Sequence, residues 1–291
     1  MGALLMTSSV KGQATSDLPL AAQGAVLEKL AGGFSFTEGP ASDSEGNVFF
    51  TDQPNDRILE WTTGEKLTTF MSPSQRSNGM FIDNRGIIWS CADEKTRLLK
   101  IFPDKRIETV VELYDGKPFN GPNDVWVTPA GGAYITDPFY ARPWWNYTVM
   151  PQEKQRVYYI APASDKAVIV VDDMKAPNGI VGTPDGKTLY IADIGSNRTW
   201  KYAVNDDGTL MGKALFCELG SDGMTMDEIG NIYLTGQGVT IFDKTGRKLG
   251  NIPVPESWTA NVCFGGHDHK SLFITASKGL YRLKMKVKGA F

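Results

Sequence analysis

The 291-residue sequence has few of the residues that most often build catalytic and metal sites, with only 2 histidines and 3 cysteines. Cys91, Cys217 and Cys263 lie far apart without a CxxC pair, which argues against a disulfide framework and a cysteine-rich zinc site. A Ser-His-Asp triad or a three-histidine zinc site would depend on His267 or His269, which both fall in a turn-like stretch. If the protein is an enzyme, its chemistry must therefore rest on carboxylates, amides or a metal.

Long apolar runs and an excess of one charge are missing as well. No apolar run reaches the roughly 18 residues of a membrane-spanning helix, so none is expected. The formal net charge of −3 argues against a nucleic-acid partner, which would require a basic patch. The hydrophobic fraction of 41% and the charged fraction of 22% are those of an ordinary globular chain. Composition says nothing about the oligomeric state.

The N-terminal segment differs from the rest of the chain. Residues 1–14 resemble the tail of a secretory signal, because an apolar stretch is followed by small residues that end at Ala14. We therefore expect residues 1–23 to be a signal remnant and disordered leader, and residues 24–291 to form the folded domain. This interpretation predicts a periplasmic or secreted protein. The alternative is a plain disordered terminus, with a cytoplasmic location.

One pattern recurs six times in the remaining sequence: a polar residue, a short apolar strand, a tight turn and a second strand. In the first copy Glu38 precedes the first strand, and the second strand ends at Asp52. Successive copies begin 39 to 55 residues apart, which is typical of propeller blades with four strands each. The sequence therefore predicts an all-β fold, a six-bladed β-propeller with four-stranded blades. A β-sandwich would not explain six copies in register.

The last copy supplies only three obvious strands, the third at residues 280–287. An apolar N-terminal stretch, residues 25–30, is expected to add the fourth strand. This strand would close the ring and cover the last exposed sheet edge.

The first polar residue of each copy is expected to lie at one mouth of the central channel, because the first strand of each blade lines the channel. These six ring residues are two carboxylates and four amides: Glu38, Asn78, Asn123, Asn178, Asp222 and Asn261. Such oxygens suit a hard divalent cation, Ca²⁺ first, with Mg²⁺, Mn²⁺ or Zn²⁺ as alternatives. Without a cation the two acids would repel each other and raise one pKa. The competing interpretation is that each residue merely starts a strand through a side-chain turn.

Four second strands end in aspartate near the same mouth. Asp52 and Asp93 are expected to cap the turns that follow them. Asp137 differs because a longer loop follows it, and this loop contains Trp144 and Trp145. We expect the loop to rise from the ligand face and the two tryptophans to stack on a ring-shaped ligand such as a sugar. Alternatively, the loop packs a small core of its own.

Arg76 lies two residues before Asn78 and so falls on the same face. It is placed to bind a hydroxyl or a carboxylate of a ligand, together with Asn78. The alternative is an ordinary surface arginine.

The segments around these residues resemble the family of senescence marker protein, gluconolactonase and luciferin-regenerating enzyme. The resemblance covers about residues 24–287 and rests on an ordered set of short segments: Glu38-Gly39-Pro40, Arg76-Ser77-Asn78-Gly79, Phe119–Val125, Pro177-Asn178-Gly179 and Ser221–Met224. It implies a six-bladed propeller with one divalent cation in the channel, often Ca²⁺. It also implies metal ligands at Glu38, Asn178 and Asp222, and metal or substrate binding by Asn123.

Many members of this family hydrolyse sugar lactones. In animal members an arginine two residues before the equivalent of Asn123 binds substrate, whereas this sequence has Gly121 there. The resemblance therefore implies that this role is missing or has moved to Arg76 or the tryptophan loop, which leaves gluconolactone itself open as the substrate.

The leading hypothesis is a metal-dependent lactonase that opens a sugar-derived lactone with an activated water and a carboxylate base. Asp222 is the first candidate for the base, and Asp137 is the second, as an acid or base under the loop. Two alternatives remain open: a phosphotriesterase-like hydrolase on the same metal site, and a non-catalytic propeller that binds a metal or a sugar.

Overall fold

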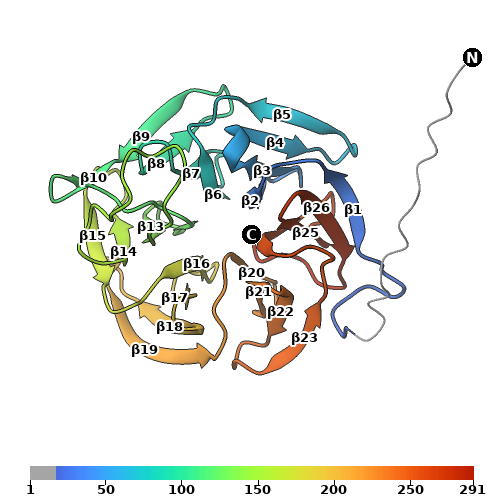
Figure 1. Cartoon of the computed structure of the whole chain (residues 1–291). Helices are drawn as coiled ribbons and strands as arrows, with labels where there is room; N and C mark the ends of the chain where they lie inside the picture. The colour runs from blue at the N-terminus through green and yellow to red at the C-terminus, as the bar shows by residue number, and fades with distance from the viewer. Residues whose placement is uncertain (1–17) are drawn as a thin grey trace, which may run out of the picture.

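The computed structural model describes residues 18–291 as six four-stranded antiparallel sheets arranged in a ring (Figure 1). Residues of the six inner strands line a central channel. The six-bladed propeller predicted from the repeat is therefore confirmed. Within residues 18–291 the only helical turn is η1 (Gln53–Asn55), and no helix is long and apolar enough to cross a membrane. The signal-like segment over residues 1–14 lies outside the described residues, so the location inferred from it stays a prediction.

The blades follow one another along the chain, and each begins with its innermost strand. Blades 1 to 3 contain β2 (Thr37–Ser42), β3 (Val48–Asp52), β4 (Arg57–Trp61), β5 (Leu67–Met71), β6 (Ser77–Ile82), β7 (Ile88–Ala92), β8 (Arg97–Ile101), β9 (Ile107–Val111), β12 (Val125–Val127), β13 (Ala133–Asp137), β14 (Arg156–Ile160) and β15 (Ala167–Val171). A small hairpin precedes blade 3 and consists of β10 (Leu113–Tyr114) and β11 (Lys117–Pro118).

Blades 4 and 5 repeat the same order, and blade 6 combines the two ends of the chain. Their strands are β16 (Pro177–Gly182), β17 (Thr188–Asp193), β18 (Arg198–Val204), β19 (Leu210–Cys217), β20 (Met224–Met226), β21 (Ile232–Gly236), β22 (Gly238–Phe242), β23 (Lys248–Ile252), β24 (Thr259–Gly265), β25 (Ser271–Ala276), β26 (Gly279–Lys284) and β1 (Glu28–Gly32).

Aspartates close several of the tight hairpins within the blades. In the turn between β6 and β7, the Asp83 Oδ1 atom accepts hydrogen bonds from the backbone N–H groups of Arg85 (2.9 Å) and Ile87 (3.1 Å). Gly86 in this turn has a φ of +74°, which glycine adopts without steric cost. Asp43, Asp227 and Asp243 hold their turns in the same way. These Asp-x-x-Gly turns therefore form the hairpins that set the strand register.

The hydrophobic core lies between neighbouring blades rather than in the channel. One cluster joins Trp89 and Leu98 of blade 2 to Val125, Ile135 and Tyr158 of blade 3. All five side chains are almost fully buried. This packing fixes the angle between blades and so positions the strands that line the channel.

The N-terminal strand closes the ring, as expected. β1 pairs antiparallel with β26, with Lys29 opposite Tyr281. The strand begins three residues later and ends two residues later than the sequence indicated. The folded part begins earlier than the expected boundary at residue 24, because Leu18 and Ala21 are buried in the core of the last blades. Ala21 also forms a β-bridge with Met285. Residues 18–23 therefore belong to the propeller and not to the leader.

Candidate active site

The six polar ring residues are all buried, with relative exposures of 9% or less. They lie where the inner strands depart from regular pairing: the ladder is interrupted beside Glu38, Asn78, Asn178 and Asn261. In blade 3 the inner strand begins only after Asn123, and in blade 5 it begins only after Asp222. Because a bulge redirects a side chain out of the regular alternation, these irregularities free the polar groups from the sheets.

A glycine follows four of the ring residues, and the structure shows why. A Cβ atom on Gly39 would lie 2.0 Å from the carbonyl oxygen of Asn78 in the next blade. On Gly223 it would lie 2.0 Å from Cγ of Asn261. The Glu-Gly, Asn-Gly and Asp-Gly pairs of the sequence therefore allow adjacent inner strands to approach closely around the channel.

Asp222 is the most firmly held member of the ring. Its Oδ1 atom accepts a hydrogen bond from Asn178 Nδ2 at 2.9 Å, and its Oδ2 atom accepts one from Trp258 Nε1 at 2.5 Å. Trp258 comes from the loop before β24, and the repeated sequence pattern did not mark this residue. Two donors, Asn178 on β16 and Trp258 in the loop before β24, thus fix the orientation of this carboxylate.

Three buried acids share the channel. Burial raises the pKa of Glu38 well above its usual range, and the charge of Asp222 raises it further, as the sequence predicted. Burial raises the pKa of Asp222 to about 6, although the hydrogen bonds from Trp258 and Asn178 lower it in part. Asp124, directly after a ring residue, was missed by sequence reasoning; its burial raises its pKa to about 7, and Asp222 adds to this shift. Without a cation the site therefore favours the protonated forms of these acids, and a bound cation would favour their charged forms.

The residues present fit a hard divalent cation. The Asn178 Oδ1 atom is buried and has no hydrogen-bond partner among residues 18–291, and the same holds for Asn78 Oδ1. An unpaired buried carbonyl oxygen is costly unless a ligand satisfies it. No three His, Cys, Asp or Glu side chains of the described chain gather into a metal-binding group. A cation in the channel would thus need amide oxygens beside the carboxylates of Glu38 and Asp222.

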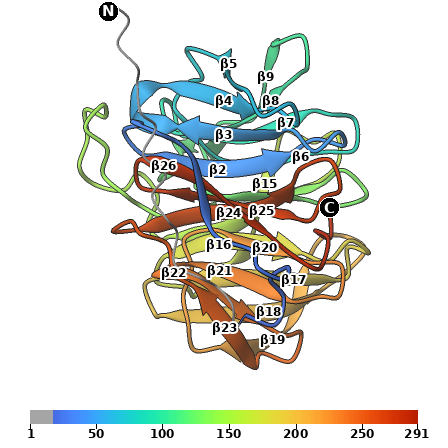
Figure 2. The same cartoon turned by 90° about the vertical axis from the view of Figure 1, so that its right-hand side faces the viewer.

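The long loop of residues 138–155, between β13 and β14, lies on the ligand side. In Figure 2 it projects from the face opposite the C-terminal residue. The Tyr140 hydroxyl accepts a hydrogen bond from Asn178 Nδ2 at 3.1 Å, so the loop reaches the ring directly. We call this segment the lid. Sequence reasoning found the lid but not Tyr140.

Asp93 anchors the lid, which corrects the expectation that it merely caps a turn. Its Oδ2 atom accepts hydrogen bonds from Arg142 Nε and from Gln53 Nε2, both at 2.6 Å. Its backbone carbonyl accepts one from Trp145 Nε1 at 2.6 Å. Burial raises the pKa of Asp93, and the positive charge of Arg142 opposes this shift. The carboxylate is available for this role because it binds no backbone N–H group of its own blade.

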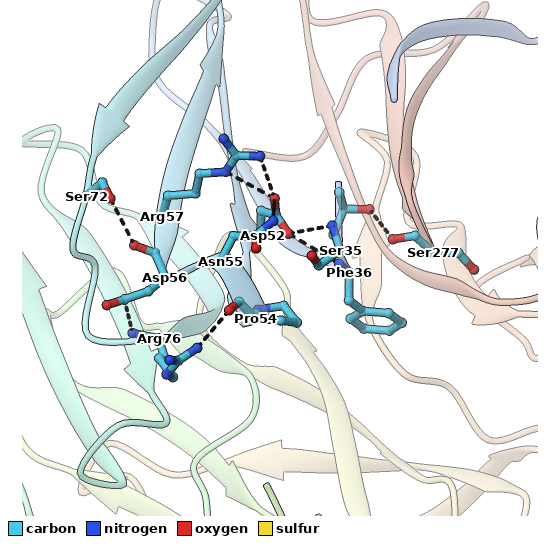
Figure 3. Close-up of polar contacts among 11 residues, drawn as sticks. Ser35, Phe36, Asp52, Pro54, Asn55, Asp56, Arg57, Ser72, Arg76 and Ser277 are labelled. Carbon is cyan, nitrogen blue, oxygen red and sulfur yellow. Dashed lines mark hydrogen bonds and ion pairs between the residues drawn. The ribbon is translucent and has the colours of Figure 1, made fainter. Parts of the chain in front are cut away.

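Asp137, expected as an acid or base, has the capping contacts instead. Its two carboxylate oxygens accept hydrogen bonds from the backbone N–H groups of Asn120 and Gly121, at 3.0 and 2.8 Å. Asp52 does the same with Ser35 and Phe36 in blade 1 (Figure 3), and Asp193 does so with Lys175 and Ala176 in blade 4. Asp137 thus supports the backbone before a ring residue, and its contacts give no support to a direct role in chemistry.

Arg76 and Trp144, both expected at the substrate, lie together. The guanidinium carbon of Arg76 is 4.3 Å from the centre of the Trp144 ring. Figure 3 shows how the arginine is held: its NH1 donates to the Pro54 carbonyl at 2.8 Å, and its backbone N–H donates to Asp56 Oδ1 at 2.7 Å. Arg76 is therefore not a loose surface side chain.

Trp145 packs inside the lid, which matches the alternative that the loop forms a small core. Its ring stacks on Tyr147 with centroids 5.0 Å apart and on Phe139 at 6.1 Å. A Cβ atom on Gly121 would lie 2.9 Å from the Trp145 ring. The indole thus occupies the space into which a side chain at position 121 would project. A side chain at position 121 would therefore have to displace Trp145.

These features define a six-bladed β-propeller with an acid-and-amide site in its channel under an aromatic lid. Residues 36–278 match the family model described as the SMP-30/Gluconolactonase/LRE-like region. The chain belongs to this family.

Named relatives agree with this placement. A gluconolactonase from Zymomonas mobilis is 29% identical over 294 residues, which cover 90% of this chain and 82% of the relative. A solved gluconolactonase from Xanthomonas campestris superposes with a TM-score of 0.84 at 25% identity and covers 94% of both chains. The calcium-binding protein regucalcin from Agrobacterium tumefaciens shares the fold, with a TM-score of 0.73 at 21% identity over 89% of this chain and 93% of that protein.

Proposed function

We propose that the protein is a lactonase that opens sugar-derived lactones with the help of a divalent cation, Ca²⁺ first. Glu38, Asn178 and Asp222 would hold the cation, and Asn78 and Asn123 would face the substrate. The observation that carries the proposal is the buried pair of Asn178 and Asp222, with one amide oxygen left without a partner. The gluconolactonases among the relatives support the choice of lactones.

A divalent cation bound at such a site supplies polarisation of a carbonyl oxygen and a lowered pKa for water. The reaction itself adds water to the lactone carbonyl carbon and breaks the bond from this carbon to the ring oxygen. One proton leaves the water and one arrives at the ring oxygen, so that the product is a hydroxy acid.

Asp222 is the proposed base that takes the proton from the attacking water. The donors Trp258 and Asn178 hold both of its oxygens, which fixes the carboxylate in one orientation before the substrate arrives. Asn78 and Asn123 add no charge and are suited to binding the hydroxyl groups of a sugar lactone.

Tyr140 is the proposed hydrogen-bond donor to a substrate oxygen. Because its hydroxyl accepts from Asn178 Nδ2, its own proton is available to a second partner. A donor in this position would stabilise the negative charge that develops on oxygen during ring opening. The lid that carries it would also exclude bulk water from the site.

The test is a hydrolysis panel with purified protein and added Ca²⁺, monitored by base consumption near pH 6.5 with subtraction of spontaneous hydrolysis. It contains a six-membered and a five-membered sugar lactone and a phosphotriester. We expect turnover of at least one lactone and a large loss of activity in Asp222→Asn. Turnover of the phosphotriester alone would replace the proposal with the organophosphate alternative. Cation binding without any turnover would favour a binding protein.

A further inference from the structure

Two arginines from different parts of the chain approach the same lid tryptophan. The guanidinium carbon of Arg76 lies 4.3 Å from the centre of the Trp144 ring, and that of Arg142 lies 5.9 Å from it. Arg142 is neutralised by Asp93, at 2.6 Å between Nε and Oδ2. Arg76 has no carboxylate partner within ion-pair distance among residues 18–291. The mouth of the site therefore holds one positive charge that the described chain leaves unmatched.

The backbone fixes Arg76 in this place at some conformational cost. Its φ is +55°, and that of the preceding residue Gln75 is +58°, in the left-handed region that residues with a Cβ rarely adopt. Hydrogen bonds to Asp56 and Pro54 keep this conformation. Conformations of this kind persist where the surrounding structure enforces them, and they cluster at ligand sites. A pre-positioned and stacked guanidinium is suited to bind oxyanions.

Charge is distributed unevenly along the site. Glu38, Asp124 and Asp222 lie in the channel, whereas Arg76 and Arg142 flank Trp144 in the lid. Asp93 neutralises Arg142, so Arg76 is the charge that attracts an anionic group at the lid end. An anionic substituent bound at the lid end would therefore orient the substrate.

We infer that Arg76, Trp144 and Arg142 form a subsite for an anionic substituent of the lactone, such as a carboxylate or a phosphate remote from the lactone carbonyl. This inference rests on the proposed lactonase function and names the class of substrate for it. Arg76 contributes the unmatched charge, and Trp144 holds its plane by stacking. Arg142 stays bound to Asp93 and sets the position of the lid.

The test compares three lactones with the same ring: glucono-1,5-lactone, its 6-phosphate, and the analogue with a carboxylate at carbon 6. We expect kcat/KM to be at least about 10-fold higher for one or both anionic lactones than for the neutral one, with the ratio falling as NaCl is added. Preference for only one of them would support the inference and identify the substituent.

Variants separate the subsite from the chemistry. Arg76→Gln should bring the ratio of anionic to neutral kcat/KM close to one, and Arg76→Lys should keep part of it. Arg106→Gln removes the same charge from an exposed outer turn and should leave the ratio unchanged. Thermal melts identify any variant that fails to fold.

Two outcomes are distinguishable. Equal kcat/KM for neutral and anionic lactones, unaffected by Arg76→Gln, would overturn the subsite while leaving the lactonase proposal standing. No hydrolysis of any lactone would overturn the lactonase proposal itself.

Discussion

Replacing Tyr140 with phenylalanine tests whether the lid takes part in the chemistry. The change deletes one oxygen atom and keeps the aromatic ring. Asn178 Nδ2 loses its 3.1 Å contact with the tyrosine hydroxyl but keeps its 2.9 Å hydrogen bond to Asp222 Oδ1. Because one partner remains, we expect the free energy of unfolding to fall by only about 1 kcal/mol.

The expected effect on catalysis is much larger than the effect on stability. A donor that stabilises the developing oxyanion is worth about 10² to 10³ in kcat. A hydrogen bond that only positions Asn178 would be worth about 1 kcal/mol, which is less than a 10-fold change. The size of the change in kcat therefore distinguishes a donor to the substrate from a structural contact.

The assay is steady-state lactone hydrolysis at saturating Ca²⁺, with kcat and KM determined separately. Tyr147→Phe is the matched control, because it removes a hydroxyl from the same lid while the aromatic ring at position 147 can still stack on Trp145. We expect the control to stay within about threefold of the parent, as hydroxyl loss at a partly exposed site costs little. A kcat in Tyr140→Phe equal to that of the parent would refute the proposed donor role.

Three further predictions concern the lid, the ring and the buried acids. Asp93→Asn weakens the contact that anchors the lid, since a charged hydrogen bond is worth about 1.5–3 kcal/mol. It should raise KM about 10-fold and also lower kcat, because the lid carries Tyr140. An unchanged KM would show that Asp93 does not anchor the lid. Gly223→Ala places a Cβ atom 2.0 Å from a neighbouring amide and should cost about 1–3 kcal/mol in chemical unfolding, whereas Gly64→Ala, with its nearest atom at 3.7 Å, should not. Burial raises the pKa of Asp124 and of Asp137 to about 7, so the cation-free native state binds more protons than the unfolded state between about pH 4 and 7. Its stability should therefore fall as pH rises through this range. A melting temperature that rises with pH would contradict the raised pKa values of these two aspartates.

The fold was predictable because its signal is repeated. Six copies of one strand-turn-strand pattern, with aspartates such as Asp83 at the turns, indicate a propeller even where one blade is irregular. The closing strand followed from the uncovered edge of the last blade. Its exact bounds did not, because the pairing of Lys29 with Tyr281 joins segments more than two hundred positions apart.

The ring residues were predictable for the same reason, whereas the contacts around them were not. Asp93 and Asp137 both end a second strand, and the sequence distinguishes them only by the loop after Asp137. Their contacts differ from those expected, because Gln53 and the lid reach the Asp93 carboxylate and backbone N–H groups reach the Asp137 carboxylate. Tyr140 and Trp258 belong to loops without a repeat, so no periodic signal marked them.

The measurement that tests the central claim most directly combines calorimetric titration of Ca²⁺ with lactone hydrolysis on the same metal-stripped sample. The account predicts one cation per chain, loss of turnover when the cation is removed, and recovery as the site is refilled. Asp222→Asn should weaken both binding and turnover, because it removes a charge from the ligand set. Full lactone turnover in protein shown by elemental analysis to be free of divalent metal would contradict the account.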